Sequence, residues 1–300
     1  MFSAFEWMMA LRYLRARRQE GFISVIAWFS LLGIMLGVAT LIIVMSVMNG
    51  FRQELLTRIL GVNGHLSVYA DTEKLTNYDG LALRVAKIDG VLKVTPMIEG
   101  QVMASANGQA KGAVVRGLRQ ADVLARPILA DNIRQGSIAN FKGKNAVMLG
   151  SRMARNLGLQ IGDKITLISP KGNVTAFGTV PRMKAYKVAA IFNVGMHEYD
   201  SSFIFMPLPA AQTYFKLKGA VSYLDVIIKD PDRAPSMARD VWIELGNKGR
   251  GYDWQRTNSS FFNAIQVERN VMFLILTLII VVAAFNIISS LIMLVKDKGR

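Results

Sequence analysis

The sequence predicts an α+β membrane protein in which two transmembrane helices flank a large, two-lobed domain. Of its 300 residues, 52% are hydrophobic and the mean hydropathy is +0.30, which is more apolar than a soluble domain. No charged residue occurs from Gly21 to Phe51 or from Asn270 to Val295. Each run exceeds the roughly 20 residues with which a helix crosses about 30 Å of hydrocarbon. Strand and helix signals alternate between the two runs and predict the domain.

Residues 1–20 are expected to form a cytoplasmic interfacial helix, because hydrophobic residues recur near one face and arginines gather at its end. The first transmembrane helix follows at 21–50. Its apolar run is about twice as long as the roughly 7 to 15 residues of a cleaved signal peptide. The second is expected at 270–295, before a cytoplasmic segment that begins at 296–300. Basic residues flank the two spans and predict that both ends are cytoplasmic: Arg12, Arg15, Arg17, Arg18, Lys296, Lys298 and Arg300.

The domain is expected at residues 51–269, with helices that continue both spans into it. The first continuation should end with Gly61 as its C′ residue, and the second should begin at about residue 258. Asn107-Gly108 predicts a tight β-hairpin, and the boundary between the lobes is expected near Arg119 to Lys144. The expected strands are 65–70, 102–106, 113–118, 145–149, 164–169, 186–192, 203–206 and 222–228, and the expected helices are 79–88, 152–157, 209–217 and 235–245.

The chain is strongly basic, with 36 Lys and Arg against 21 Asp and Glu and a net charge of +15. The segment from Arg52 to Arg269 keeps about +11 when the seven basic and three acidic residues outside it are subtracted. Because this charge is scattered and not gathered in one reading element, we exclude a nucleic-acid-binding protein. The charge favours an acidic partner, or anionic lipid headgroups, on the domain side of the membrane.

Catalytic and cofactor motifs are missing or broken. The sequence has no cysteine, which excludes disulfides, cysteine zinc sites, iron–sulfur clusters and a thiol nucleophile. His197-Glu198 begins an H-E-x-x-H pattern, but Ser201 replaces the second histidine. Gly143-Lys144-Asn145 resembles the end of a Walker A loop without its Ser or Thr, and no serine lies in a G-x-S-x-G turn. We therefore expect no metal, no cofactor and no enzyme activity, so that any energy must come from a partner chain.

The transmembrane segments contain residues that favour contact with other helices. Gly33 and Gly37 form a small-xxx-small pair, which allows close helix packing, although glycines are also tolerated in long spans. Asn286 lies near the middle of the second apolar run, and its amide is expected to face another helix because lipid offers it no partner. These residues predict assembly with other transmembrane helices.

Six short segments identify a known family when they are taken together. They are Ala10-Leu-Arg-Tyr-Leu, Phe22-Ile-Ser-Val-Ile-Ala, Gly33-Ile-Met-Leu-Gly-Val, Val47-Met-Asn-Gly-Phe-Arg, Gly162-Asp-Lys-Ile and Ala283-Ala-Phe-Asn-Ile-Ile-Ser-Ser-Leu. Their combination, spread over essentially the whole chain, resembles the lipoprotein-releasing permeases of the LolC/LolE family, which belong to the FtsX/MacB-type ABC transporters. The resemblance implies a MacB-like periplasmic domain. It also implies a non-catalytic subunit, in the bacterial inner membrane, that extracts lipoproteins from the outer leaflet.

The resemblance further implies a set of partners. In the family, two such permeases assemble with a separate ATPase, LolD, and pass the lipoprotein to the periplasmic carrier LolA. The family also has four spans, with a cytoplasmic coupling helix after the second. Because the sequence stops at Arg300, near that point, we expect a truncated chain that does not engage the ATPase productively by itself.

The resemblance assigns carrier binding to a hook-like loop at residues 170–181 and to a basic pad beside it. By itself, the segment is a hairpin connection longer than usual, with a proline at each end, and an ordinary long loop is the alternative. The pad would consist of Arg182 and Lys184. A hook and a pad together favour a LolC-like subunit or a LolC/LolE hybrid. The hook comprises Pro170, Lys171, Gly172, Asn173, Val174, Thr175, Ala176, Phe177, Gly178, Thr179, Val180 and Pro181.

A lipoprotein cavity is expected where the two spans leave the outer leaflet. A protein that lifts acyl chains from the bilayer needs apolar surface at this level, and methionines adapt to variable apolar shapes. The alternative is that the same residues simply pack the stalk of the domain. The candidates are Met45, Met48, Phe51, Leu55, Phe261, Ile265 and Met272.

Two other functions share parts of this pattern. An FtsX/MacB-like permease could handle another substrate or regulate a cell-wall hydrolase, although only about 20 residues precede the first span, where MacB carries its ATPase. A two-span membrane sensor would have the same hairpin topology and would need a cytoplasmic signalling domain beyond Arg300.

Overall fold

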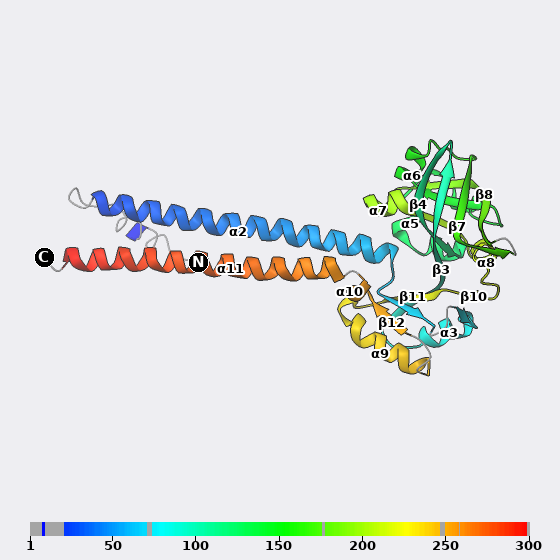
Figure 1. Cartoon of the computed structure of the whole chain (residues 1–300). Helices are drawn as coiled ribbons and strands as arrows, with labels where there is room; N and C mark the ends of the chain where they lie inside the picture. Colours follow the sequence, from blue (N-terminus) through cyan, green and yellow to red (C-terminus); the bar gives the residue numbers. More distant parts are fainter. Residues whose placement is uncertain are drawn as a thin grey trace. The chain divides into compact units, whose positions relative to one another are not determined.

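The computed structural model describes residues 8–9, 21–70, 74–175, 178–246, 250–257 and 259–298. The chain divides into two compact units (Figure 1). The helical unit comprises Met1–Glu54 and Ser259–Arg300, and the domain unit comprises Leu55–Asn258. The expected interfacial helix at residues 1–20 lies outside the described residues, apart from Met8 and Met9.

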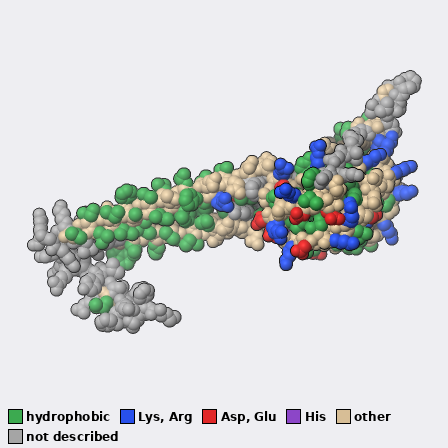
Figure 2. All heavy atoms as spheres, turned by 90° about the horizontal axis from the view of Figure 1, so that it is seen from below, with side chains coloured by type: hydrophobic (Ala, Val, Ile, Leu, Met, Phe, Trp, Pro, Cys, Tyr) green, Lys and Arg blue, Asp and Glu red, His purple; other side chains and the backbone are tan. Residues whose placement is uncertain are grey.

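Two long helices, α2 (Gly21–Val62) and α11 (Ser259–Lys298), contain the candidate membrane spans. The spans are Leu31–Val62 and Asn263–Ser289, with mean hydropathies of 2.6 and 3.0. Almost none of their apolar side chains is buried within the chain, and hydrophobic side chains cover most of the described surface of the helical unit (Figure 2). Apolar surface of this extent needs lipid or other helices around it. Two transmembrane helices flanking the domain, as the sequence predicts, account for it.

Gly61 corrects one expectation about α2. The helix continues through Gly61 to Val62, so Gly61 is not its left-handed C′ residue. An added Cβ at this position would lie 3.1 Å from Cβ of Ile128. The glycine therefore permits close packing of the helix against Ile128 and does not end it.

Six strands of the domain unit close into a barrel. Following the hydrogen-bonded ladders, β3 (Val91–Ala106) pairs with β4 (Gln109–Leu118), β4 with β9 (Phe203–Pro207), and β9 with β6 (Ala146–Gly150). Strand β6 pairs with β8 (Gly178–Phe192), β8 with β7 (Lys164–Thr175), and β7 returns to β3. The ring itself has no edge strand, because each of its six strands pairs with a neighbour on both sides. Strand β5 (Ile133–Gly136) adds to β8 outside the ring.

The registers place one set of buried side chains on the inner face of the barrel. Paired residues share a face of a sheet, and residues two apart in a strand do as well. Each of the six strands therefore contributes buried side chains to one continuous inner face that runs around the whole barrel. These inner residues are Val102, Ala104, Ala113, Val115, Ile204, Leu149, Val147, Val188, Tyr186, Ile165 and Leu167.

Short helices cover parts of the outside of the barrel. They are α4 (Gln120–Leu124), α5 (Pro127–Ala130), η1 (Ile138–Asn140), α6 (Ser151–Asn156), α7 (His197–Ser202) and α8 (Leu208–Tyr214). A hydrophobic cluster that includes Phe141, Phe192, Phe205 and Val62 packs beneath several of them. Helix α8 approaches so closely that a Cβ on Gly117 would lie 2.2 Å from Cβ of Ala211.

The second lobe is an antiparallel sheet of β12 (Arg250–Asp253), β1 (Leu66–Tyr69), β11 (Tyr223–Ile228) and the first half of β3. Its other elements are α3 (Tyr78–Val85), α9 (Ala234–Glu244), α10 (Trp254–Thr257), η2 (Pro231–Arg233) and the small sheet of β2 (Leu75–Thr76) and β10 (Ala220–Val221). In the sequence, the barrel lobe is thus inserted between two segments of this second lobe. Strand β3 belongs to both lobes. The expected boundary near Arg119 to Lys144 is wrong, because α4, α5 and β5 in that range belong to the barrel lobe.

The structure confirms most of the elements that local patterns predict. Asn107 and Gly108 have φ angles of 50° and 75° and join β3 to β4 as a two-residue turn. The predicted strands are present, and β3, β7 and β8 are longer than expected. The sequence analysis missed β5, β12 and α7, which are short and have little hydrophobic periodicity.

A buried ion pair connects the end of α2 to both lobes. Arg126 and Asp225 are 1% and 2% exposed, and Arg126 Nη2 donates to Asp225 Oδ2. Arg126 Nη1 donates to the carbonyl oxygen of Val62 at 3.0 Å, and the amide of Gly64 donates to Asp225 Oδ1 at 2.8 Å. The pair therefore satisfies a carbonyl at the end of α2 that has no partner within the helix.

Candidate functional site

The first candidate site is a two-stranded ribbon formed by parts of β7 and β8 (Figure 1). Strand β3 pairs with β7 only at Thr166, Leu167 and Ile168, and β6 pairs with β8 only from Lys187 onward. Beyond Ile168 in β7 and before Lys187 in β8, the described residues of each strand pair only with the other strand. The ribbon therefore extends beyond the barrel and takes no part in closing it.

The predicted hook is the outer part of this ribbon. The sequence analysis had expected a long hairpin connection, whereas most of the segment is strand. The strands run to Thr175 and resume at Gly178. The ladder is irregular between Ser169 and Asn173, where three residues of β7 face Pro181 of β8. Proline donates no backbone hydrogen bond to a ladder, and prolines at both ends of the hook explain the irregularity.

Two glycines are needed for the shape of the ribbon. A Cβ on Gly172 would lie 2.0 Å from the carbonyl oxygen of Val180, in the opposite strand. Gly178 has a φ of +116° at the end of the turn, where any other residue would be strained. The two glycines of the predicted hook thus have different roles: Gly172 permits the close approach of the opposite strand, and Gly178 adopts a positive φ.

The structure describes only some of the predicted hook side chains. Pro170, Val180 and Pro181 are exposed, and Val180 is 55% exposed. Ala176 and Phe177 lie outside the described residues, as do the side chains of Lys171, Asn173, Val174, Thr175 and Thr179.

The predicted pad residues lie at the base of the ribbon, on the strand face that continues into the barrel interior. Arg182 Nη1 donates to the carbonyl oxygen of Tyr214, and Arg182 Cζ lies 5.9 Å from the centre of the Tyr214 ring. Lys184 Nζ donates to the carbonyl oxygen of Lys144 at 3.2 Å and lies 4.9 Å from the centre of the Tyr186 ring. Both cations are half-buried and held by aromatic and carbonyl groups.

Two buried phenols support the pad. Burial raises the pKa of Tyr214 to about 12, although the positive charge of Arg182 opposes the shift. Burial also raises the pKa of Tyr186, and Tyr214 adds to that shift. Neither hydroxyl has a hydrogen-bond partner in the described part of the chain. Both phenols stay neutral at physiological pH and add no negative charge beside the pad.

The opposite face of the ribbon base is apolar, a feature that the sequence analysis missed. Met183 lies between the two pad cations in sequence, points away from them and is 63% exposed. Across β7, Ile168 pairs with both Met183 and Met103, and Met103 is 49% exposed. The alternation of Arg182, Met183 and Lys184 could have indicated these two faces.

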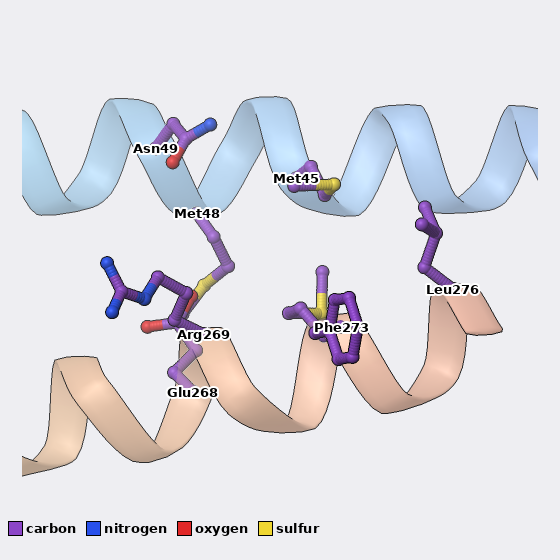
Figure 3. A pocket seen from close by; sticks show the side chains of 8 residues that line it. Met45, Met48, Asn49, Glu268, Arg269, Phe273 and Leu276 are labelled. Carbon is purple, nitrogen blue, oxygen red and sulfur yellow. The ribbon is translucent and has the colours of Figure 1, made fainter.

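The second candidate site is a pocket of about 320 Å³ between α2 and α11 (Figure 3). Its described lining residues are Met45, Met48, Asn49, Glu268, Arg269, Met272, Phe273 and Leu276. Met48 projects from α2 towards α11, and Leu276 projects from α11 towards α2. Flexible methionines and an aromatic ring form the apolar part, and charged and amide groups lie at one end. Such a pocket suits an elongated apolar group with a polar end.

Three of the seven predicted cavity residues line this pocket: Met45, Met48 and Met272. Phe51 is 57% exposed and Ile265 is half-buried, and neither belongs to the described lining. The side chains of Leu55 and Phe261 lie outside the described residues. The sequence analysis missed the remaining lining residues, because only the pairing of the two helices brings them together.

The predicted packing residues differ in their surroundings. A Cβ on Gly37 would lie 3.9 Å from Cγ2 of Ile279 in α11, so the two helices approach each other at this point. A Cβ on Gly33 would have no described atom within 4 Å. The side chain of Asn286 lies outside the described residues.

Comparisons with known proteins agree with this architecture. Residues 27–242 match the MacB-like periplasmic core domain family. The chain is 36% identical to the lipoprotein-releasing system transmembrane protein LolC of Neisseria meningitidis and 33% identical to that of Xylella fastidiosa, covering 99% of this chain and 72% of each relative. It is 27% identical to LolE of Haemophilus influenzae, over 96% of this chain and 70% of that one.

Solved structures show a weaker likeness. The periplasmic region of MacB from Actinobacillus actinomycetemcomitans matches with a TM-score of 0.44 and 11% identity, covering 68% of this chain and 96% of that one. The extracellular domain of the transporter YknZ from Gram-positive bacteria matches with a TM-score of 0.42 and 15% identity, covering 63% and 97%.

Proposed function

The chain belongs to the family of lipoprotein-releasing system transmembrane proteins, with a MacB-like periplasmic core domain, and from this premise we propose its function. It is a permease subunit of an ABC transporter that extracts lipoproteins from the outer leaflet of the bacterial inner membrane. The observation that carries the proposal is 36% identity to a LolC over 99% of the chain.

The proposed topology follows from charge and from the domain type. Both ends lie in the cytoplasm, because basic residues flank the spans there. The domain proposed at 51–269 lies in the periplasm, and a MacB-like periplasmic core is consistent with that side. The proposed spans at 21–50 and 270–295 fall largely within α2 and α11.

The proposed partners are a LolD-type ATPase, a second LolC/LolE-type permease and the carrier LolA. The chain itself is non-catalytic, and ATP hydrolysis takes place on the ATPase. Relatives named LolC and LolE both exist in Haemophilus influenzae, which supports pairing of two such permeases. Closure of the ATPases would move stiff transmembrane helices, and an unbroken α2 of 42 residues suits that task.

The hook and pad are the proposed carrier-binding site. The described part of the ribbon pairs with no other barrel strand beyond Ile168, so its removal should leave the barrel intact. We expect the full chain with residues 170–181 replaced by Asn-Gly to lose LolA binding while its thermal unfolding stays unchanged. Unchanged LolA affinity in that variant would refute the assignment.

Charge reversal tests the pad separately. The double variant Arg182→Glu/Lys184→Glu should slow association with LolA, and the wild-type rate should fall as salt rises. The matched control is Arg134→Glu/Arg155→Glu, which changes the charge equally at two exposed arginines far from the pad in sequence. An equal loss in both variants would assign the effect to net charge and not to the pad.

The pocket between α2 and α11 is the proposed place for a lipoprotein acyl chain. Met48→Glu in the complete transporter should abolish lipoprotein crosslinking and release, because a carboxylate in an apolar pocket is strongly disfavoured. Phe51→Glu is the control on the same helix outside the described lining. If the Met48 variant fails to assemble with the ATPase, the pocket is packing surface and the cavity lies elsewhere.

A further inference from the structure

The domain unit has a second hollow, about 320 Å³ in volume, between α9 and β12. Helix α9 contributes Arg239 and Trp242, which share a helical face because they are three residues apart. Strand β12 contributes Arg250 and Tyr252, which share a strand face because they are two apart. Arg256 of α10 completes the wall. We call this hollow the α9–β12 pocket.

Small residues at the bottom bring the two elements together. A Cβ on Gly251 would lie 3.4 Å from Cβ of Ala238, so the backbone of β12 packs directly against α9. Strand β12 is the last strand of its sheet. Among the described strands, none pairs with its outer edge.

The described lining of the pocket concentrates positive charge. Three of its lining side chains are guanidinium groups, and none of the described lining residues is acidic. Within the described part of the chain, the side chains of Arg239 and Arg256 make no ion pair. Guanidinium groups bind phosphate oxygens in a bidentate fork, so the preferred ligand is a phosphate-bearing anion.

The aromatic wall and the chain connection point to a lipid as the source of that phosphate. Trp242 and Tyr252 are 41% and 39% exposed, and Ile243 beside them is 60% exposed. Exposed Trp and Tyr with neighbouring arginines are typical of the membrane–water interface. Six residues lie between Arg256 and Asn263, where the candidate span within α11 begins, and the seven Cα-to-Cα steps that join these two residues reach at most about 25 Å.

We propose that the α9–β12 pocket binds the phosphate of an anionic phospholipid headgroup, with Trp242 and Tyr252 against its glycerol and acyl region. This binding would be a function of the domain separate from lipoprotein release and carrier binding. It does not depend on the hook or on the pocket between α2 and α11.

The test measures binding of short-chain lipids to the full chain in detergent by titration calorimetry. The probes are dihexanoyl-phosphatidylglycerol, dihexanoyl-phosphatidylcholine and inorganic phosphate. We expect phosphatidylglycerol to bind, and Arg239→Gln/Arg256→Gln to weaken it about tenfold or more through lost charge-assisted hydrogen bonds. Arg134→Gln/Arg155→Gln is the charge-matched control and should retain binding. Arg239→Lys/Arg256→Lys should be intermediate, because lysine keeps the charge and loses the fork.

Each other outcome overturns the proposal. Equal binding of phosphatidylcholine would exclude recognition of the anionic headgroup. Phosphate binding as tight as that of phosphatidylglycerol would show a site for free anions, and equal weakening by the control pair would show binding by net charge alone. Retained binding in the Arg239 and Arg256 variant would place the lipid elsewhere.

Discussion

The buried ion pair of Arg126 and Asp225 offers the sharpest test of how the domain is held together. We predict that Arg126→Met destabilises the domain unit strongly, although methionine fills a similar volume. The change leaves the carboxylate of Asp225, 2% exposed, with the Gly64 amide as its only described hydrogen-bond donor. It also removes the described side-chain donor to the Val62 carbonyl at the end of α2.

The expected loss follows from the burial of the pair. Removing one partner of a buried ion pair costs about 3–5 kcal/mol, because the remaining charge is uncompensated. The lost hydrogen bond to Val62 is part of the same perturbation and is not added to it. The control is Arg119→Met, which breaks an ion pair with Asp79 whose side chains are 43% and 61% exposed. That change should cost about 1 kcal/mol or less.

The assay is urea unfolding of the full chain in detergent, followed by near-ultraviolet circular dichroism. Trp254 is 5% exposed, and its Nε1 donates to the Pro231 carbonyl at 2.9 Å, so it reports packing of the domain unit. The double variant Arg126→Met/Asp225→Leu should recover part of the loss, because apolar replacement of a whole buried pair is often nearly neutral. A loss in Arg126→Met no larger than that of Arg119→Met would refute the reasoning.

Three further predictions concern single sites. Burial lowers the pKa of His65 in the folded chain. Below a pH of about 6.5, His65 therefore binds more protons in the unfolded chain than in the folded chain, and the free energy of unfolding should fall on acidification. His65→Gln should flatten that decline in unfolding midpoints between pH 7.5 and 5, and His197→Gln should not. Gly172→Ala should raise the rate of amide hydrogen exchange in the ribbon alone, because the added Cβ would lie 2.0 Å from the Val180 carbonyl oxygen. The control is Gly112→Ala, where an added Cβ has no described atom within 4 Å. Equal exchange rates of the ribbon amides in the two variants would contradict this prediction. Tyr214→Phe should leave stability unchanged or raise it by about 1 kcal/mol, since its buried hydroxyl has no described partner; a clear loss in thermal unfolding would show that the hydroxyl is satisfied.

Features that depend on neighbouring residues could be predicted from the amino-acid sequence. The two candidate spans follow from runs without charge, because each run is long enough for a helix to cross the hydrocarbon of a bilayer. The hairpin at Asn107-Gly108 follows from the backbone freedom of those two residues. The family follows from short segments spread over the chain. The predicted hook was taken for a loop, although most of it forms a ladder, because proline usually interrupts strands.

Contacts between distant segments became visible in the folded chain and could not be predicted from sequence patterns. The barrel closes through pairs such as Val115 with Ile204, in strands separated by several other elements. Arg126 meets Asp225 across 99 positions, and the arginines of the α9–β12 pocket come from three elements. Local propensity carries no information about these contacts, because each depends on strand order, register and the packing of helices over the sheet. The physical reason is that burial and pairing are properties of the folded whole, whereas helix length and turn type depend on adjacent residues.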